Sequence, residues 1–384
     1  MRSVALAALK ASWDGGWPFD RLELKLREEV RGFVGEWARR GPLWWQVGNQ
    51  MVPGFYRELA RRGWIGLHWP PALGGSGMSR VATALLLEEL NYGLAPDGGL
   101  IPAVAFLGDL LLACGTPEQQ QRWLPRLARG EVVASLGLTE PEAGSDLAAV
   151  STRAEPREEG LEVWGEKIFT GLAHQADVAI VLLRSEVQVE DRHQGLTVCL
   201  VDLHQPAVGV EELKTWGGWR QNRVVFQGAK VSWDEVVGEV GQGWQVLTTL
   251  INLERSAIAR IGLIRRLLEE TWPDHREGTR DWLRLWQEAE ALRLLNYRMA
   301  QAWDLGKRVR PFQGSLLKVR AAQLLDEVID LVRDRFGLMG FAFNRSPEMA
   351  QILDAVERNR ALFTIGGGVP AVQKDAIAKF GLNL

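Results

Sequence analysis

Residues 138–146 (LTEPEAGSD) concentrate hydroxyl groups, carboxylates and a glycine in a single predicted turn. Threonine and serine hydroxyls donate and accept hydrogen bonds, and a turn that contains proline and glycine can expose backbone N–H groups. Such a turn suits a ligand that is anionic or rich in carbonyl oxygens. Taken alone, the same residues could also form an ordinary turn ahead of a β domain, so the turn has to be interpreted with the rest of the chain.

Glu254 is the second residue that could perform chemistry, as a general base. A carboxylate serves as a base where an apolar, dehydrated environment raises its pKa. Leu250 lies four residues before it, and Ile258 and Ile261 lie four and seven residues after it. Helical spacing would put all three on the face that carries Glu254, which predicts a glutamate within a buried stripe. The alternative is that Glu254 and Arg255 form a pair on a solvated helix face.

Helical segments dominate residues 20–130, apart from a loop rich in proline and glycine at 69–79. The first predicted helix repeats apolar residues at steps of three and four: Leu22, Leu26, Val30, Phe33, Val34 and Trp37. Thr116 followed by Pro117 predicts a later helix start, with the threonine as its cap.

Residues 131–235 are rich in short β runs instead. Four strands are predicted, at residues 162–170, 178–183, 196–201 and 223–231. They do not alternate with long helices, which argues against a doubly wound parallel sheet and for a compact antiparallel sheet or barrel. From residue 243 onward long apolar stripes return, and they predict a helical bundle.

The sequence therefore predicts an α+β multidomain protein. Its parts would be an N-terminal α-helical domain (1–130), a middle antiparallel β-barrel-like domain (131–236) and a C-terminal four-helix bundle (237–384). This order of helices, sheet and helices is uncommon, so it narrows the possible families.

The composition argues against several classes of protein. A formal net charge of −3 does not suit a nucleic-acid binder, which normally shows a basic face. Cys114 and Cys199 are the only cysteines, so we expect no disulfide framework and a cytoplasmic, reducing location. The five histidines do not cluster, and no metal site is predicted. The apolar run at the N-terminus is too short for a signal peptide, and no membrane span is expected.

The turn at 138–146 closely resembles the signature of the acyl-CoA dehydrogenase family. Five further segments resemble that family, in the same order along the chain. They are RGWIGLHWPPALGGSGMS, GTPEQQQRWLPRLARGE, GEKIFTGLAHQADVAIVLLRS, GGWRQNRVVFQGAKVSWDEVVGEVGQGW and TIGGGVPAVQKDAIAKFG. The family's fold agrees with the order of helices, sheet and helices inferred above. The resemblance implies an oxidoreductase of fatty acid metabolism that acts on a CH–CH group.

The resemblance also implies FAD, held between the β domain and the C-terminal bundle near a subunit interface. The positions that match the family's flavin contacts are Leu138, Thr139, Gly144, Ser145, Phe169 and Thr170. Thr139 would lie near the pyrimidine end of the isoalloxazine, and Phe169 would replace a tryptophan that packs on the flavin. Ser145 also matches a contact to the acyl-CoA substrate, and Arg255 would position the base or the substrate.

In the implied reaction, two hydrogens leave adjacent carbons of an acyl thioester. The α-proton goes to a base, the β-hydride goes to flavin N5, and an electron-transfer flavoprotein receives the electrons. Much of the family carries the base in a C-terminal loop, where Gly367 stands here. Other branches place a glutamate directly before an arginine on a helix, which matches Glu254 and Arg255. One such branch acts on bulky or steroid-derived CoA esters.

Some positions differ from the family pattern. Gly171 replaces a threonine or serine near the flavin, and Asp334 replaces a glutamine near its adenosine part. An Arg-x-x-Phe-Gly segment that contacts the neighbouring subunit's flavin is not found between Arg265 and Arg293. We therefore expect a homotetramer or dimer, or one partner, catalytic or not, of a heterotetramer. A related flavin oxidase or monooxygenase is the remaining alternative.

Overall fold

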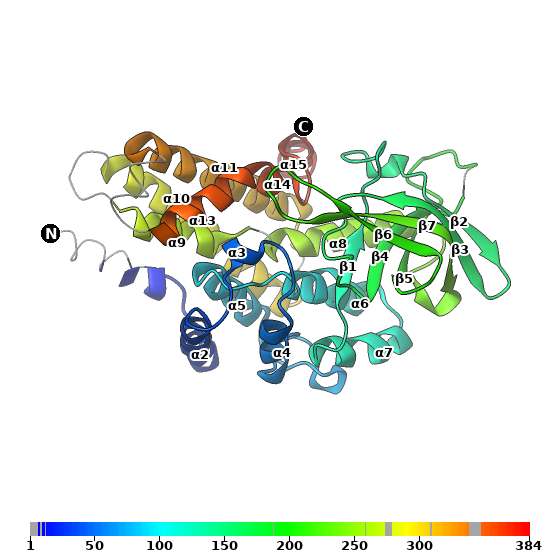
Figure 1. The fold of residues 1–384 in the computed structure, drawn as a ribbon, viewed down its shortest axis with the longest axis horizontal. Coiled ribbons are helices and arrows are strands. Elements are labelled where there is room, and N and C mark those ends of the chain that lie inside the picture. Colours follow the sequence, from blue (N-terminus) through cyan, green and yellow to red (C-terminus); the bar gives the residue numbers. More distant parts are fainter. Residues whose placement is uncertain are drawn as a thin grey trace. The chain divides into compact units, whose positions relative to one another are not determined.

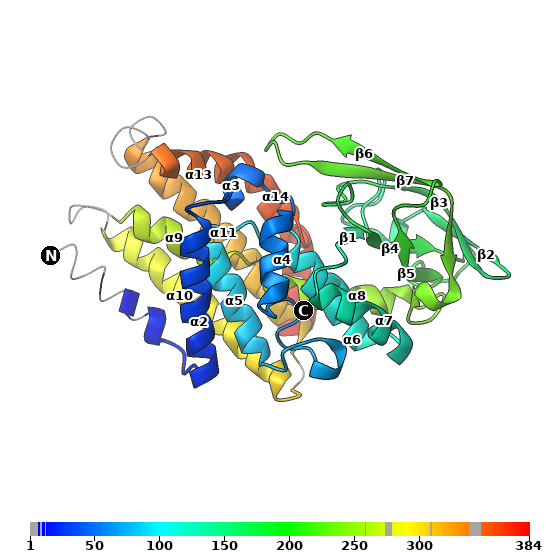
Figure 2. The same ribbon diagram turned by 60° about the horizontal axis from the view of Figure 1, so that its bottom comes forward.

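The chain forms two compact units in the computed structural model (Figure 1, Figure 2). The structure describes residues 7, 10, 11, 13–186, 188–257, 259–272, 279–307, 309–337 and 347–384, with the backbone alone at 254–257, 335, 336 and 347. The helical unit comprises Met1–Gln46, Met78–Ala95 and Arg255–Leu384, and the sheet unit comprises Val47–Gly77 and Pro96–Glu254. No helix in the described ranges is long and apolar enough to cross a membrane.

Amphipathic helices build the helical unit. They are α2 (Arg21–Trp37), the start of the short α3 (Trp44–Val47), α5 (Arg80–Tyr92), α9 (Ile261–Glu270), α10 (Thr279–Asp304), α11 (Pro311–Phe336), α13 (Pro347–Arg358), α14 (Arg360–Ile365), α15 (Pro370–Ile377) and the π-helical turn η5 (Ala378–Leu382). Asp20 caps α2, because its carboxylate accepts hydrogen bonds of 2.8 Å from the backbone N–H groups of Leu22 and Glu23. The stripe predicted for this helix is buried from Leu26 to Trp37, whereas Leu22, in the first turn, is 63% exposed.

The sheet unit also contains shorter helices. They are α4 (Pro53–Arg61), η1 (Pro71–Leu73), the π-helical η2 (Pro102–Gly108), α6 (Asp109–Cys114), α7 (Pro117–Ala128), η3 (Leu147–Ala149), η4 (Trp233–Glu235) and most of α8 (Gly243–Ala257). The helix start predicted at Thr116 is confirmed, since its hydroxyl accepts a hydrogen bond of 3.2 Å from the Gln119 N–H.

One mixed sheet forms the core of the sheet unit. Its strands are β1 (Ala134–Gly137), β2 (Arg153–Arg157), β3 (Gly160–Lys167), β4 (Val178–Arg184), β5 (Leu196–Asp202), β6 (Val208–Leu213), β7 (Gln221–Ser232) and β8 (Val236–Val237). The strand order is β6-β7-β3-β2-β4-β5-β8, and β1 pairs with β4. Figure 2 shows β6 and β7 as a long hairpin. The antiparallel prediction is confirmed for most pairings, while β1–β4 and β2–β4 are parallel.

The predicted strand at 162–170 ends early, at Lys167. Phe169 has a φ of +53°, a left-handed conformation that interrupts an extended strand and turns the chain away from the sheet. β2 and β6 were not predicted, because their exposed positions carry charged side chains and they show no continuous apolar run.

The helix that carries Glu254 also ends earlier than the spacing of the apolar residues around Glu254 predicted. α8 stops at Ala257, and Arg260, with a φ of +49°, precedes α9. A left-handed residue interrupts the helical repeat. Ile261 is buried on α9, so its predicted place on the face of Glu254 is wrong. Leu250 is buried on α8 as predicted, and Ile258 lies outside the described residues.

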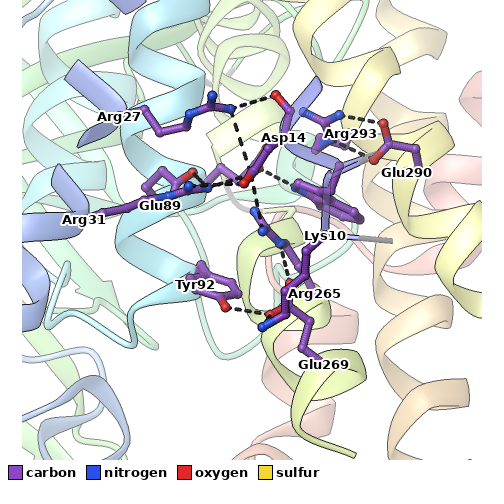
Figure 3. A network of polar contacts seen from close by, with 12 residues as sticks. Lys10, Asp14, Arg27, Arg31, Glu89, Tyr92, Arg265, Glu269, Glu290 and Arg293 are labelled. Atoms are coloured by element: carbon purple, nitrogen blue, oxygen red, sulfur yellow. Dashed lines mark hydrogen bonds and ion pairs between the residues drawn. The ribbon is translucent and has the colours of Figure 1, made fainter. Parts of the chain in front are cut away.

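Buried charges join α2, α5 and α9 within the helical unit (Figure 3). Arg31 on α2 donates two hydrogen bonds, of 2.7 and 2.8 Å, to the Glu89 carboxylate on α5, and a third of 2.7 Å to Asp14. Arg265 on α9 pairs with Glu269 on the same helix at 2.8 Å and with Asp14 at 3.4 Å. Burial raises the pKa of Glu89 and Arg31 opposes that rise, so the ionised carboxylate depends on this arginine.

Arg31→Met should lower the free energy of unfolding by about 3 kcal/mol, because it leaves a buried carboxylate without its bidentate partner. Denaturant unfolding of the flavin-free protein, followed by circular dichroism, measures the change. Arg284→Met is the matched control, since Arg284 makes ion pairs with half of its side chain in solvent. Its loss should cost less than about 1 kcal/mol. Equal losses in the two variants would show that the buried network adds no more to stability than an exposed ion pair does.

Candidate functional site

Two segments of the sheet unit that were singled out in the sequence meet where their strands end. Residues 138–146 follow β1, and residues 168–170 follow β3. The Ile168 N–H donates a hydrogen bond of 2.8 Å to the Thr139 carbonyl oxygen. The structure thus brings Thr139 and Thr170 into one small region of the same unit.

A buried ion pair clamps these segments together. The ammonium of Lys167, at the end of β3, lies 2.6 Å from the Glu140 carboxylate and donates a second hydrogen bond, of 3.1 Å, to the Leu138 carbonyl oxygen. The side chains of Lys167 and Glu140 are 0% and 4% exposed. Neither residue was predicted from the sequence, although a lysine that ends an apolar strand pattern is an available signal.

Hydrogen bonds complete the environment of Glu140. Its carboxylate accepts from the Ser151 N–H at 2.6 Å, the Ser151 hydroxyl at 2.9 Å and the Thr152 N–H at 3.0 Å. Burial opposes ionisation of Glu140, but the Lys167 ammonium and these hydrogen bonds outweigh it and lower the pKa. Burial lowers the pKa of Lys167 to about 8, against the attraction of Glu140. The buried contacts of Glu140 therefore hold the turn that follows β1 in place.

The outer part of the turn is open to a ligand. Leu138 and Thr139 are half-buried, and Gly144 and Ser145 are exposed. A Cβ atom on Gly144 would meet no other atom within 4 Å. The turn thus carries one hydroxyl at Thr139 and another at Ser145, with open space beside Gly144, and its contacts with flavin and substrate stay a prediction.

Phe169 and Thr170 fit a flat, polar cofactor. The Phe169 ring is 56% exposed and is held there by its left-handed backbone. Thr170 is 1% exposed, and its Oγ1 has no hydrogen-bond partner in the described part of the chain. Its backbone is fixed by Asn222, which accepts from the Thr170 N–H at 3.0 Å and donates to its carbonyl at 2.8 Å. An exposed aromatic ring beside an unpaired buried hydroxyl suits an isoalloxazine ring with hydrogen-bonding edges.

α8 carries Glu254 within the same unit as these residues. Gly243 starts the helix against β5, where a side chain would come within 2.7 Å of the Leu196 carbonyl oxygen. Leu247 and Leu250 are fully buried, and Glu254 follows them by seven and four residues. Its backbone position therefore continues the buried face of α8. The side chains of Glu254 and Arg255 lie outside the described part.

The loop that matches the base-carrying loop of much of the family has glycine at position 367. Gly367 and Gly368, in the helical unit, have φ angles of +72° and +101°, which favour glycine. Gln373 donates a hydrogen bond of 2.9 Å to the Gly367 carbonyl, and the Lys318 ammonium donates to the carbonyls of Thr364 and Gly368. The loop offers no carboxylate at position 367, and its backbone is held from within the unit.

A pocket of about 350 Å³ opens in the sheet unit where α8 begins. His193 and Trp244 line it, with ring centroids 4.5 Å apart. Glu254 lies ten residues after Trp244, about three helical turns along α8.

The chain matches the models of all three parts of one family. These are the acyl-CoA dehydrogenase N-terminal domain at residues 21–131, the middle domain at 135–229 and the C-terminal domain at 241–382. Acyl-CoA dehydrogenase FadE26 of Mycobacterium tuberculosis is 30% identical over 94% of this chain and 96% of its own length.

Solved structures agree with this match. The Tcur3481–Tcur3483 steroid ACAD superposes with a TM-score of 0.84 at 28% identity, over 95% of this chain and 98% of that chain. The ChsE4–ChsE5 complex from Mycobacterium tuberculosis superposes with a TM-score of 0.82 at 25% identity, again over 95% and 98%. With its signature turn, its helical and sheet architecture and all three domain models matched, the chain is a member of the acyl-CoA dehydrogenase family.

Proposed function

We propose that the protein removes the α-proton and the β-hydride of an acyl-CoA thioester, with Glu254 as the base. The observation that carries this proposal is that a carboxylate is present at position 254 and absent at position 367, the two positions where the family pattern places the base. Position 367 is a glycine at positive φ, whereas the backbone position of Glu254 continues the buried face of α8 in the unit that carries the segments predicted to contact the flavin. An apolar face raises the pKa of a carboxylate towards the range that a base needs.

FAD, when bound, would accept the hydride that leaves the β-carbon, while the α- and β-carbons form a double bond. The chain's own residues would do the rest. Leu138, Thr139, Gly144, Ser145, Phe169 and Thr170 would hold the flavin. Ser145 and Arg255 would orient the substrate, and the Glu254 carboxylate would take the α-proton.

The substrate is proposed to be a CoA ester with a bulky acyl group. The pocket beside His193 and Trp244 offers aromatic rings on which the nucleotide of CoA could stack. The solved relative described as a steroid ACAD shares 28% of its sequence with this chain, which supports the same substrate class here.

A spectroscopic titration tests this function. The flavin-replete protein is mixed, without oxygen, with straight-chain, branched and steroid-side-chain acyl-CoA esters, and its visible flavin absorption is followed. We expect bleaching by a bulky ester and transfer of the electrons to an electron-transfer flavoprotein. A replete sample that no saturated ester bleaches would refute the proposal. Bleaching followed by rapid peroxide formation in air would instead identify an oxidase.

A second candidate function is that of one partner in a heteromeric dehydrogenase. Two structural relatives are named as pairs, Tcur3481–Tcur3483 and ChsE4–ChsE5. Asp334, on α11, is 77% exposed at a position where the family pattern has a glutamine beside FAD. A second chain that supplies such a contact would complete the site. The mass of the purified protein, alone and after co-expression with a neighbouring dehydrogenase gene, distinguishes a homo-oligomer from a hetero-oligomer.

A further inference from the structure

Some residues near Gly171, in the sheet unit, carry buried polar atoms that have no hydrogen-bond partner in the described part of the chain. Three such atoms occur on segments that border this glycine: Asn49 Oδ1, Thr170 Oγ1 and His174 Nδ1. Buried polar atoms in folded proteins almost always have partners, so a group of three needs an explanation. A ligand or a water molecule would supply the missing partners.

Two side-chain amides border the space that Gly171 leaves open. A Cβ atom on Gly171 would lie 3.5 Å from Asn49 Nδ2 and 3.5 Å from Gln221 Oε1. These are ordinary contact distances, so the glycine is not demanded by crowding. Gln221 is 5% exposed, and the Ser135 hydroxyl holds the Gly171 carbonyl at 2.7 Å. The two amides thus offer donors and acceptors to one small space beside Thr170.

The loop that carries Asn49 is fixed before any ligand arrives. Gly48 has a φ of +64°, and a Cβ atom there would come within 2.6 Å of the Trp219 ring. The Gln175 side chain accepts from the Met51 N–H at 3.0 Å and donates to the Met51 carbonyl at 3.1 Å. A polar group held in place by its surroundings loses little entropy when it binds, as a built ligand contact should.

We propose that Asn49 and Gln221 hydrogen-bond the polar edge of the flavin ring, in place of a hydroxyl side chain at position 171. This inference rests on the proposed function, because it takes FAD as the cofactor. Amide groups match the carbonyl and N–H groups of such an edge, since each amide both donates and accepts. Neither residue belongs to the set of flavin contacts that the family pattern implies for this chain.

The test measures FAD binding and not only activity. Asn49→Leu and Gln221→Leu should each raise the Kd for FAD about tenfold, the loss expected for one hydrogen bond, and should shift the visible absorption of the bound flavin. Gln50→Leu is the matched control, because Gln50 is the exposed neighbour of Asn49, and it should leave both unchanged. Gly171→Ser, which adds a hydroxyl in the same space, should recover part of the affinity of Asn49→Leu.

The outcomes separate this inference from the proposed function. If the wild-type protein binds no FAD under replete conditions, the proposed function fails and the inference fails with it. If the wild-type protein binds FAD and both leucine variants keep its Kd and spectrum within twofold, only the inference is refuted, and water satisfies the amides. A loss of thermal stability in the flavin-free variants, with an unchanged FAD spectrum, would equally refute it by showing a structural role.

Discussion

Glu254→Gln should bind FAD as tightly as the wild-type protein and yet fail to bleach with any acyl-CoA. The change keeps the size and shape of the side chain but replaces the basic carboxylate by a neutral amide, so the α-proton has no acceptor. A general base contributes about 10²–10⁴-fold to a proton transfer, and we expect at least that loss in the rate of flavin reduction. Stopped-flow absorption under anaerobic conditions measures the rate, and equilibrium titration measures substrate binding.

The control for this experiment is Glu270→Gln, on α9. Glu270 pairs with Arg266 at 3.0 Å and its side chain is 44% exposed, so its neutralisation should leave the rate of flavin reduction unchanged. The pH profile adds a second criterion. Loss of the base should remove the acidic limb of the reduction rate, whereas a merely structural defect would lower the rate equally at every pH. Retained turnover in Glu254→Gln would show that another residue acts as the base.

The architecture was predictable because the chain changes its periodicity between domains. Helical stripes, the cap at Thr116 and the four main strand runs follow local chemistry that a single sequence contains. Local patterns do not fix where an element stops. α8 ends at Ala257, shortly before Arg260, and β3 ends at Lys167, shortly before Phe169. Arg260 and Phe169 both have positive φ, a conformation that the side chains of arginine and phenylalanine do not predict.

The site was predictable at the level of segments but not of contacts. The turn at 138–146 was evident as a unit, and the structure joins it to residues 168–170. The pair of Glu140 and Lys167 joins residues 27 apart in the chain, and the region around Gly171 includes Asn49, more than 100 residues earlier. Such pairings depend on the sheet register and on loop packing, which hydrophobic periodicity does not encode.

Lys167→Met should both destabilise the sheet unit and release FAD. It leaves the buried Glu140 carboxylate without its counter-ion, which costs about 3–5 kcal/mol of unfolding free energy. It also removes the donor to the Leu138 carbonyl, so the turn that carries Thr139 loses its inner support. Denaturant unfolding measures the first effect and FAD titration measures the second.

A second variant separates the two effects of this substitution. In Lys167→Met/Glu140→Gln the buried charge is gone, and the new amide oxygen can still accept from the N–H and hydroxyl of Ser151, whereas the amide nitrogen would face the Thr152 N–H. Part of the stability should therefore return, while FAD affinity should stay low, because the Leu138 carbonyl is still unsupported. Full recovery of FAD affinity in this double variant would show that the clamp stabilises the fold without positioning the flavin.

The dependence of stability on pH gives an independent measure of the same lysine. Burial lowers the pKa of Lys167 from 10.5 to about 8 in the folded protein, so between these values the unfolded chain binds more protons at this residue than the folded one does. Stability rises with pH wherever the unfolded state binds more protons. The contribution of Lys167 to the unfolding free energy should therefore increase from about pH 8 towards pH 10.5, and the difference between wild type and Lys167→Met should widen over that range. A constant difference would contradict this prediction, and would show that the attraction of Glu140 fully offsets the effect of burial on the pKa of Lys167.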